Sequence, residues 1–230
     1  MKKIICQLSL LVLLFLTSAQ VVAVADDGKN PGYHGLDLSH HNGAVDWSRL
    51  SSANIHFVFV KATEGMDDKD PSFDSHWRDA QKAGIVRGAY HFYVTEDPPE
   101  KQAQFFIDTV KLGSGDLIPA IDIEVLGKNT APDVAGRLQV FIDILTQHYG
   151  KKPIIYTGRV FWNATMNDKF GQNPLWIAEY GVQKPIDPEG WQDWHFWQWT
   201  QNATIPGVEK EVDLNYFNHK DKTFSDLLLP

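Results

Sequence analysis

The sequence predicts an α/β fold, an abbreviated TIM-like barrel, from three observations. Five strand-like segments alternate with helix-like segments through residue 157, which is typical of a parallel sheet joined by helical crossovers. Three more strand-like segments follow, and the connections between them are rich in Gly and Pro and show no helical stripe. Eight strands with some crossover helices missing indicate a βα barrel that lacks part of its helical layer.

The first two strands follow from apolar patterning. In residues 34–39 two leucines share one face and Asp37 points to the other, because side chains alternate along a strand. Asp46 comes next and can cap a short helix. Residues 55–60 are an almost continuous apolar run, as in a parallel strand buried on both sides, and the polar group 61–65 ends this run.

Three amphipathic helices follow, each opened by a cap or a proline pair. The first begins at Asp70-Pro71 and ends at Gly84. The second opens at Pro98-Pro99, and the third at Thr130, where Asp133 resembles the partner of a capping box. Their apolar faces are Phe73, Trp77 and Ala80; Ala103, Phe106, Ile107 and Val110; and Val134, Leu138, Phe141, Ile142 and Leu145. The remaining strands are predicted at residues 86–93, 117–124, 153–157, 175–178, 195–199 and 212–214.

The strand at residues 117–124 carries two acids at a spacing of two. Asp122 and Glu124 therefore point to one side and the neighbouring isoleucines to the other. Mutual repulsion and partial desolvation raise the pKa of such carboxyl groups, a condition that an acid catalyst of glycoside cleavage needs. From this segment alone, an edge strand with a solvated acidic face is an equally good interpretation.

The ends of the other strands add acids and aromatic rings. In barrels of this type the chemistry lies at the carboxyl ends of the strands. The side chains at these ends are Asp37, Glu64, Tyr90, His91, Asp122, Glu124, Tyr156, Glu179, Tyr180, Trp197, Gln198 and Asp213. A ring of structural salt bridges would need basic partners, and Lys61 alone qualifies. Carboxylates with aromatic rings are typical of a carbohydrate site. The candidate stacking rings are Tyr90, Tyr156, Trp176, Tyr180 and Trp197, of which about half are expected to serve packing alone.

The first 25 residues predict a signal peptide. Two lysines precede an apolar run over residues 4–16, and Ala23-Val24-Ala25 has the small-x-small pattern that signal peptidases cut. An uncleaved membrane anchor is the alternative, but the run is interrupted by polar residues and is short for a span. Export would leave a flexible leader at 26–33 and a single catalytic barrel domain at 34–230.

The composition limits the chemistry that this chain can carry out and the partners that it can bind. The single cysteine, Cys6, lies in the predicted signal, so the mature chain would have no disulfide and no thiol nucleophile. A formal charge of −8 argues against a nucleic-acid partner. His40-His41 could bind a metal, but no second spaced pair follows, so loop histidines are favoured. We expect a secreted or periplasmic monomer without a cofactor or metal and without stable membrane association after cleavage.

Eight short motifs then occur in a characteristic order. They are GLDLS (35–39), VKATEG (60–65), GAYHF (88–92), DIE (122–124), IYT (155–157), LWIAEY (175–180), WQW (197–199) and VDLN (212–215). Together they resemble the glycoside hydrolase family 25 lysozymes, which are N-acetylmuramidases of fungi, bacteria and phage endolysins. The similarity runs from about residue 34 to residue 217, essentially the whole domain.

The resemblance implies a barrel of five βα units followed by three β-strands. It implies hydrolysis of the β-1,4 bond between N-acetylmuramic acid and N-acetylglucosamine in peptidoglycan, with retention. Glu124 would be the general acid/base. Asp122 would act from the opposite side, either as nucleophile or by orienting the 2-acetamido group, and Asp37 and Asp213 would complete the acidic cluster. The substrate-binding candidates are Glu64, Tyr90, His91, Tyr156, Trp176, Tyr180, Trp197 and Gln198.

Simple chemistry supports the role of Glu124. Its side chain has one more methylene than Asp122 and lies nearer the strand end, so it can reach a leaving-group oxygen. Negative charges at Asp37, Asp122 and Asp213 are expected to raise the pKa of Glu124 and keep it protonated near neutral pH.

Other functions are less consistent with the residues. Family 18 chitinases also have an acid-rich fourth strand, but their motif places another acid where this chain has Ala120. A catalytically inactive barrel that binds peptidoglycan is the main alternative, and the presence of all four acids argues against it. A metal-dependent barrel enzyme is a more distant third.

Overall fold

The computed structural model describes residues 32–166 and 168–230, and the predicted signal peptide lies outside them, as do residues 26–31 of the predicted leader. Tyr33, one residue before the predicted start of the domain, packs against it. The ring of Tyr33 stacks on Phe224 with centroids 5.2 Å apart, and its carbonyl oxygen accepts the N–H of Phe217. Residue 33 therefore belongs to the packed domain.

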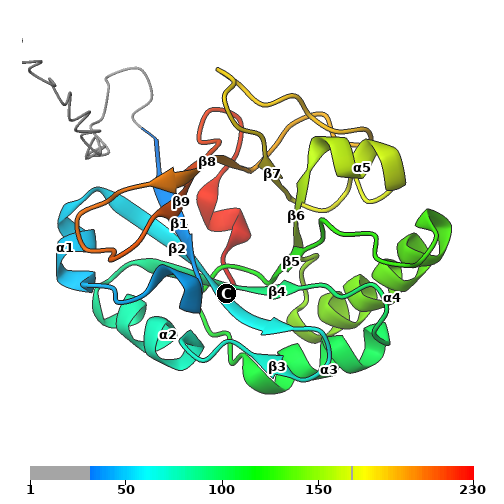
Figure 1. Cartoon of the computed structure of the whole chain (residues 1–230), viewed down its shortest axis with the longest axis horizontal. Helices are drawn as coiled ribbons and strands as arrows, with labels where there is room; N and C mark the ends of the chain where they lie inside the picture. The colour runs from blue at the N-terminus through cyan, green and yellow to red at the C-terminus, as the bar shows by residue number, and fades with distance from the viewer. Residues whose placement is uncertain (1–31, 167) are drawn as a thin grey trace, which may run out of the picture.

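Strands of the described residues close into an eight-stranded barrel with one further two-residue strand outside it (Figure 1). In ring order the strands are β1 (His34–Leu38), β2 (Ile55–Glu64), β4 (Val86–Phe92), β5 (Ala120–Asp122), β6 (Ile154–Gly158), β7 (Leu175–Ala178), β8 (Phe196–Ala203) and β9 (Val212–Phe217). The ring closes because β1 pairs with β2 in parallel and with β9 in antiparallel orientation. Strand β3 (Asp68–Lys69) pairs with β2 alone. The predicted barrel is confirmed.

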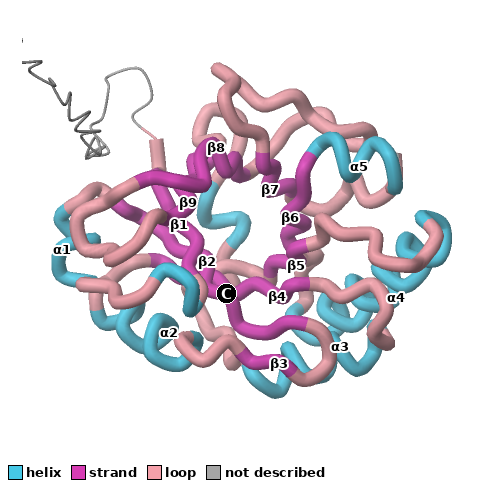
Figure 2. Tube along the Cα trace, in the orientation of Figure 1, coloured by secondary structure: helices cyan, strands magenta, loops and turns pink. Residues whose placement is uncertain are grey.

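Helices cover the outside of the first part of the ring (Figure 2). They are α1 (Trp47–Ser52), α2 (Phe73–Lys82), α3 (Pro99–Thr109), α4 (Ala131–Tyr149) and α5 (Arg159–Thr165). In the described chain no α-helix separates β7, β8 and β9, so five βα units precede three strands, as the resemblance implied. Two short 3-10 helices, η1 (His40–Asn42) and η2 (Phe224–Leu227), complete the fold. No helix among these has the length and apolar character needed to cross a membrane.

Helix starts agree with the predictions in part. Asp46 caps α1, because its carboxylate accepts the N–H groups of Ser48 and Arg49. Asp70 does not cap α2: its carboxylate instead accepts the N–H and hydroxyl of Ser72, and the helix begins at Phe73.

The predicted capping box at the start of α4 is also absent. Thr130 does occupy the N-cap position of that helix. Its hydroxyl donates to the Asp133 carboxylate at 2.5 Å and makes no cap bond to the backbone. The ionised carboxylate is a stronger hydrogen-bond partner than a backbone amide, which explains the change of partner.

The strand predicted at residues 117–124 is shorter, because β5 covers Ala120–Asp122 alone. Pro119 has no N–H to donate to a ladder, and Leu117 pairs instead with Leu228 near the C-terminus. Glu124 therefore lies just beyond the end of the strand. Strand β5 pairs with β4 on one side and β6 on the other, so the interpretation as an edge strand is wrong.

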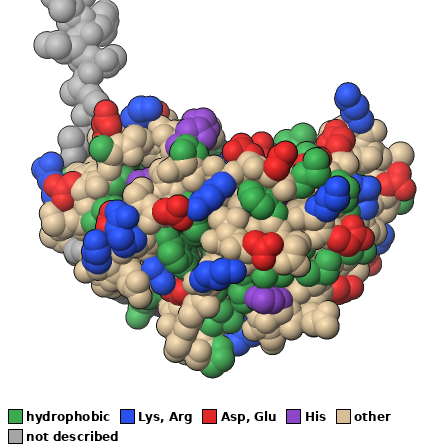
Figure 3. Space-filling model, turned by 90° about the horizontal axis from the view of Figure 1, so that it is seen from below, with side chains coloured by type: hydrophobic (Ala, Val, Ile, Leu, Met, Phe, Trp, Pro, Cys, Tyr) green, Lys and Arg blue, Asp and Glu red, His purple; other side chains and the backbone are tan. Residues whose placement is uncertain are grey.

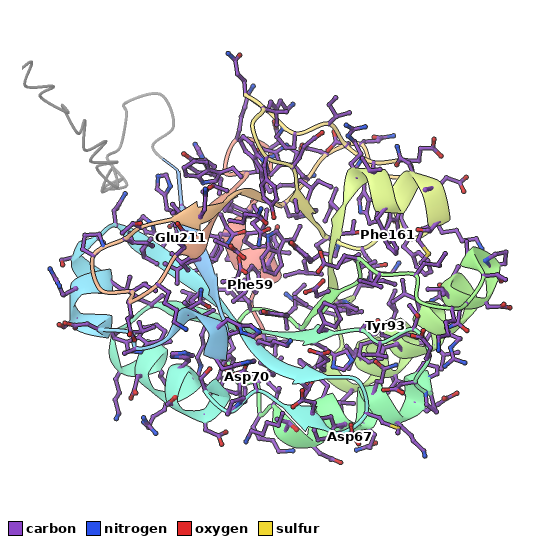
Figure 4. The ribbon with its side chains drawn as sticks, viewed as in Figure 1. Phe59, Asp67, Asp70, Tyr93, Phe161 and Glu211 are labelled. Atoms are coloured by element: carbon purple, nitrogen blue, oxygen red, sulfur yellow. The ribbon has the colours of Figure 1, made fainter. Side chains whose placement is uncertain are left out.

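Two separate apolar layers follow from the alternation of side chains along the strands. Outward-pointing residues such as Leu36 and Ile121 pack with the helices, in the same cluster as Leu138 and Phe141. The inward-pointing layer fills the barrel and contains Phe57, Phe59, Trp176 and Phe196, joined by Leu227 and Leu229 of the C-terminal segment. Figure 4 shows Phe59 inside the ring and Tyr93 on the side of the helices.

Two glycines on inward-facing positions make room for the inner rings. A Cβ at position 35 would overlap the ring of Phe57, and one at position 88 would lie 2.8 Å from Phe59. The rings of Phe57 and Phe59 therefore fit inside the barrel because positions 35 and 88 carry no side chain. The filled interior forms an apolar floor beneath the inward-pointing acids.

Candidate active site

A hollow of about 360 Å³ lies at the carboxyl ends of the parallel strands. Eight of the twelve predicted site residues line it, namely Asp37, Tyr90, Asp122, Glu124, Tyr156, Trp176, Gln198 and Asp213. Seven of these residues lie on seven different strands and Glu124 follows β5, so barrel closure is what brings them together. This convergence at one rim is the arrangement expected of a barrel active site.

Asp37 and Asp213 face each other across the closing seam of the barrel. They are direct partners in the antiparallel pairing of β1 with β9. The Oδ2 atom of Asp37 accepts hydrogen bonds from Gln198 Nε2 at 2.9 Å and Asn215 Nδ2 at 2.8 Å. The Oδ2 atom of Asp213 accepts one from Gln198 Nε2 at 3.3 Å. Amide groups therefore hold both carboxyl groups in place.

Asp122 and Glu124 share a direction but differ in environment. The Asp122 side chain ends β5 and is buried, with 8% of its surface exposed. Its Oδ1 atom has no hydrogen-bond partner in the described part of the chain. Glu124 is exposed at the rim of the hollow. One carboxyl group therefore lies on the floor of the site, and the other reaches toward solvent.

Burial raises the pKa of all four acids, and neighbouring negative charge adds to this effect for Asp122, Glu124 and Asp213. Burial is the main cause for Asp122, followed by the charges of Glu124 and Asp37. Burial also raises the pKa of Asp37, although the hydrogen bonds from Asn215 and Gln198 oppose this. For Asp213, burial is followed by the charge of Asp37 as a cause of the raised pKa.

The pKa of Glu124 is raised, as predicted, although the causes differ from those expected. Partial burial contributes most and the charge of Asp37 comes second, while the charge of Lys61 opposes both. Lys61 lines the hollow and pairs with Glu64, with Nζ 2.6 Å from Oε2. The site thus combines four acids whose pKa values are raised with one nearby cation.

Four predicted side chains do not line the hollow, and two of them point away from it. His91 is fully buried on the outer side of β4, bonded to Thr63 and Gln102, and burial lowers its pKa to about 4. Trp197 also points outward and donates its indole N–H to the Glu179 carbonyl. Strand alternation explains both, because their neighbours in the strands, at positions 90 and 198, point inward. His91 and Trp197 therefore lie outside the site.

The other two predicted residues are connected to the hollow through hydrogen bonds. Tyr180 donates its hydroxyl to Gln198 Oε1 at 2.5 Å. Glu64 holds Lys61, as described above, at the edge of the hollow. Both therefore support groups that line the site.

Several lining residues were not predicted, among them Lys61, Ser39, His41, Asn42, Phe92, Gln201 and Glu211. Asn215, which bonds to Asp37, was missed as well. Its spacing of two from Asp213 places both on one strand face, so the sequence contained the signal. The residues of η1 follow β1 in a loop, and their contribution depends on the tertiary fold. Among the described residues, no group of three or more His, Cys, Asp or Glu is arranged to hold a metal ion.

Known proteins share both sequence and fold with this chain. The family model described as "Glycosyl hydrolases family 25" matches residues 36–208. Lysozyme M1 of Streptomyces globisporus is 33% identical over 205 residues, covering 81% of this chain and 68% of that protein. The uncharacterized protein YegX of Escherichia coli K12 is 34% identical over 190 residues, covering 80% and 69%. The crystal structure of a bacterial lysozyme from Streptomyces coelicolor superposes with a TM-score of 0.79 at 30% identity, covering 85% of this chain and 95% of that one.

Proposed function

The chain belongs to glycosyl hydrolase family 25, and from that premise we propose that it cleaves the β-1,4 bond between N-acetylmuramic acid and N-acetylglucosamine in peptidoglycan. It is a glycoside hydrolase related to lysozymes. One observation carries the proposed mechanism: four acids converge in a single hollow, with Glu124 at the rim beside the buried Asp122. The choice of bond comes from the family.

Glu124 is the proposed general acid and base. A proton donor must reach the glycosidic oxygen and must be protonated when the substrate binds. The exposed position of Glu124 gives it access to the leaving group, and partial burial with the charge of Asp37 raises its pKa. After the leaving group departs, the same carboxylate can take a proton from the attacking water.

Asp122 is the proposed second catalytic carboxyl group, which acts from the side opposite Glu124. Its Oδ1 atom has no partner within the described chain, so this atom is free to face a positive centre or a 2-acetamido N–H of the substrate. Loss of the Asp122 proton is favoured when positive charge develops nearby. In the proposed retaining reaction, Asp122 therefore acts as the stabiliser or the nucleophile.

Tyr90 and Tyr156 are proposed to form the floor of the glycan site, with the buried Trp176 packed beneath them. Tyr156 packs edge-on against Trp176 with ring centroids 4.6 Å apart, and Tyr90 does the same at 6.3 Å. Such locked rings present a rigid apolar surface to the C–H face of a sugar. The Tyr156 hydroxyl is already bonded to Gln198, which fixes its ring further.

The proposal includes export through residues 1–25 and action as a monomer outside the cytoplasm. The substrate of the proposed reaction lies outside the cytoplasmic membrane, which is why export belongs to the proposal. Mass spectrometry of the secreted protein would check the first part, with a mature chain beginning at Asp26 as the expected result.

The reaction itself is tested by mass spectrometry of peptidoglycan digested with the purified protein. We expect fragments whose reducing ends are muramic acid. Fragments with glucosamine at the reducing end, or no release of fragments by a folded protein, would contradict the proposed bond.

A further inference from the structure

The side-chain amide of Gln198 has one fixed orientation. Gln198 lies on β8 at the floor of the hollow with 2% of its surface exposed. Its Oε1 atom accepts the hydroxyl of Tyr156 at 2.9 Å and that of Tyr180 at 2.5 Å. An amide oxygen has no proton to donate, so both tyrosines must be the donors. The Nε2 group consequently points the other way, toward Asp37 and Asp213.

The amide donors are distributed unequally between the two acids. Asp37 Oδ2 receives two of them, from Gln198 at 2.9 Å and Asn215 at 2.8 Å. Asp213 receives one, at 3.3 Å, from the same Gln198 nitrogen. The Asn215 amide is itself oriented by the indole N–H of Trp176, which donates to Asn215 Oδ1 at 2.7 Å. Hydrogen bonds to a carboxylate favour its ionised form, so this arrangement favours charge on Asp37.

A single proton on the pair resolves the repulsion between the two acids. Residues directly opposite in an antiparallel pair have neighbouring side chains, and like charges there are unfavourable. Burial raises the pKa of both acids, but two amide donors counter this effect at Asp37 alone. We propose that Gln198 is a positioning residue that keeps Asp37 ionised and leaves the shared proton on Asp213.

This assignment connects the pair to the general acid. The charge of Asp37 is the main electrostatic contribution that raises the pKa of Glu124. Gln198 thus acts on the proton donor through Asp37 rather than through contact with the sugar. The inference rests on the proposed function, because Glu124 is the general acid within that proposal.

Other titratable groups around the pair come from every neighbouring strand. They are Lys61 from β2, Tyr90 from β4, Asp122 from β5 with Glu124 beyond it, Tyr156 from β6 and Tyr180 beyond β7. His41 and Glu211 also line the hollow. Burial raises the pKa of all three tyrosines, so their hydroxyls stay protonated and remain donors or neutral groups through the acid range. The three tyrosines therefore do not change charge near the pair in that range, and the neighbouring acids with a raised pKa are Asp122 and Glu124.

The test is a Gln198→Met substitution, which keeps the side-chain length and removes both hydrogen-bonding groups. Carbon-13 NMR titration of the aspartate carboxyl groups should show the pKa of Asp37 rising by about one unit, because a charge-assisted donor is lost. Wall hydrolysis should show kcat falling about tenfold with little change in KM. The alkaline limb of the pH profile, which reports the pKa of the general acid, should move to lower pH. Gln139→Met on the exposed face of α4 is the matched control and should match wild type in all three readouts.

Three outcomes would overturn the assignment. One is an unchanged carboxyl titration in a folded Gln198→Met protein. A second is a higher KM with an unmoved pH profile, which would make Gln198 a substrate contact. A third is a loss of kcat that equals the loss of folded protein, again with an unmoved profile. Should Gln198→Met fail to fold, the double variant Tyr156→Phe with Tyr180→Phe leaves the amide present but unoriented. This double variant should raise the pKa of Asp37 by less than Gln198→Met does. An unchanged pKa of Asp37 in the double variant would also contradict the inference.

The titration also separates this inference from the proposed function. If wild type yields no muramic acid reducing ends, the proposed function fails, while NMR still decides which acid carries the proton. If wild type cleaves the expected bond and the substitution leaves the titration unchanged, the inference about Gln198 fails alone.

Discussion

At the scale of single residues, Asp122 and Glu124 show how local position separates two similar side chains. They are two residues apart and point in one direction, yet β5 ends at Asp122. Asp122 is consequently buried with one oxygen unpartnered in the described chain, whereas Glu124 is exposed. The shared direction comes from strand geometry, and the difference in burial comes from where the strand ends.

Glu124→Gln should abolish wall lysis and leave the fold intact. The amide keeps the size of the side chain but cannot deliver a proton, and general acid catalysis contributes about 10²–10⁴ in rate. Turbidity of a cell-wall suspension measures the loss, and far-UV circular dichroism checks the fold. Glu189→Gln, at an exposed position, is the control and should keep wild-type activity. A Glu124→Gln protein with a near wild-type rate would remove Glu124 from the mechanism.

Asp122→Asn should stabilise the protein at neutral pH while it removes activity. Burial and neighbouring charges raise the pKa of Asp122 in the folded state above its unfolded value. The folded protein then binds the proton more tightly than the unfolded chain, so this contribution to stability is complete below the unfolded pKa. It is lost as the pH rises through the folded pKa.

The asparagine cannot ionise, so the free energy of unfolding at pH 7 should increase by about 1–2 kcal/mol. Urea unfolding at pH 4 and pH 7 measures the difference. The stabilisation should be present at pH 7 and much smaller at pH 4. Equal effects at both pH values would show that the carboxyl titration is not the cause.

At the scale of elements, the ends of strands and helices depend on partners that lie far away in sequence. Strand β5 begins at Ala120 because Pro119 precedes it and the backbone of Asp116 and Ile118 is hydrogen-bonded to the C-terminal segment. Helix α2 begins at Phe73 because Asp70 bonds to Ser72 and also to His40, 30 residues upstream. Side-chain periodicity correctly predicted the buried faces of α3 and α4, since that property is local.

Gly35→Ala should destabilise the barrel, because the new methyl group would overlap the ring of Phe57. Overpacking of this kind costs about 1–3 kcal/mol. Gly136→Ala on α4 is the matched control, since the space that its methyl group would occupy is open. That change should stabilise the helix by about 0.5–1 kcal/mol. Urea unfolding of both variants checks the opposite signs, and a neutral Gly35→Ala would show that the ring can move aside.

At the scale of the whole molecule, the barrel is held from inside by an aromatic layer that the C-terminal segment closes. Leu227 and Leu229 join the inner cluster, and the carbonyl of Leu227 accepts the N–H of Ile118. In Figure 1 this segment, in red, lies within the outline of the ring. The surface in Figure 3 shows acidic and basic side chains interspersed, with no basic patch that would suit a polyanion on that face of the described chain.

Leu227→Ala should lower the stability of the entire domain. Its side chain is 5% exposed, and truncating a buried leucine costs about 2–5 kcal/mol. Thermal unfolding should remain a single transition at a lower Tm, because the inner layer touches many strands. Val160→Ala on α5 is the control, with a side chain that is 76% exposed and an expected change within about 0.5 kcal/mol. Local fraying of the C-terminus without a shift of the main transition would contradict this role.

The sequence by itself determined the order of the eight barrel strands and of helices α1 to α4, and the four acids that line the hollow. Its residue patterns did not predict β3 or place α5. The predicted properties depend on alternation, helical periodicity and short motifs, which act over a few residues. The alternation also held the information that His91 and Trp197 point outward.

The tertiary structure alone decided which acids become neighbours and what holds them. Asp37 receives its donors from Gln198 and Asn215, which are 161 and 178 residues away along the chain. Such contacts depend on how β9 closes the ring against β1 and in which register. Register and closure are properties of strand pairs rather than of any one strand, and for that reason the pattern of a single segment does not contain them.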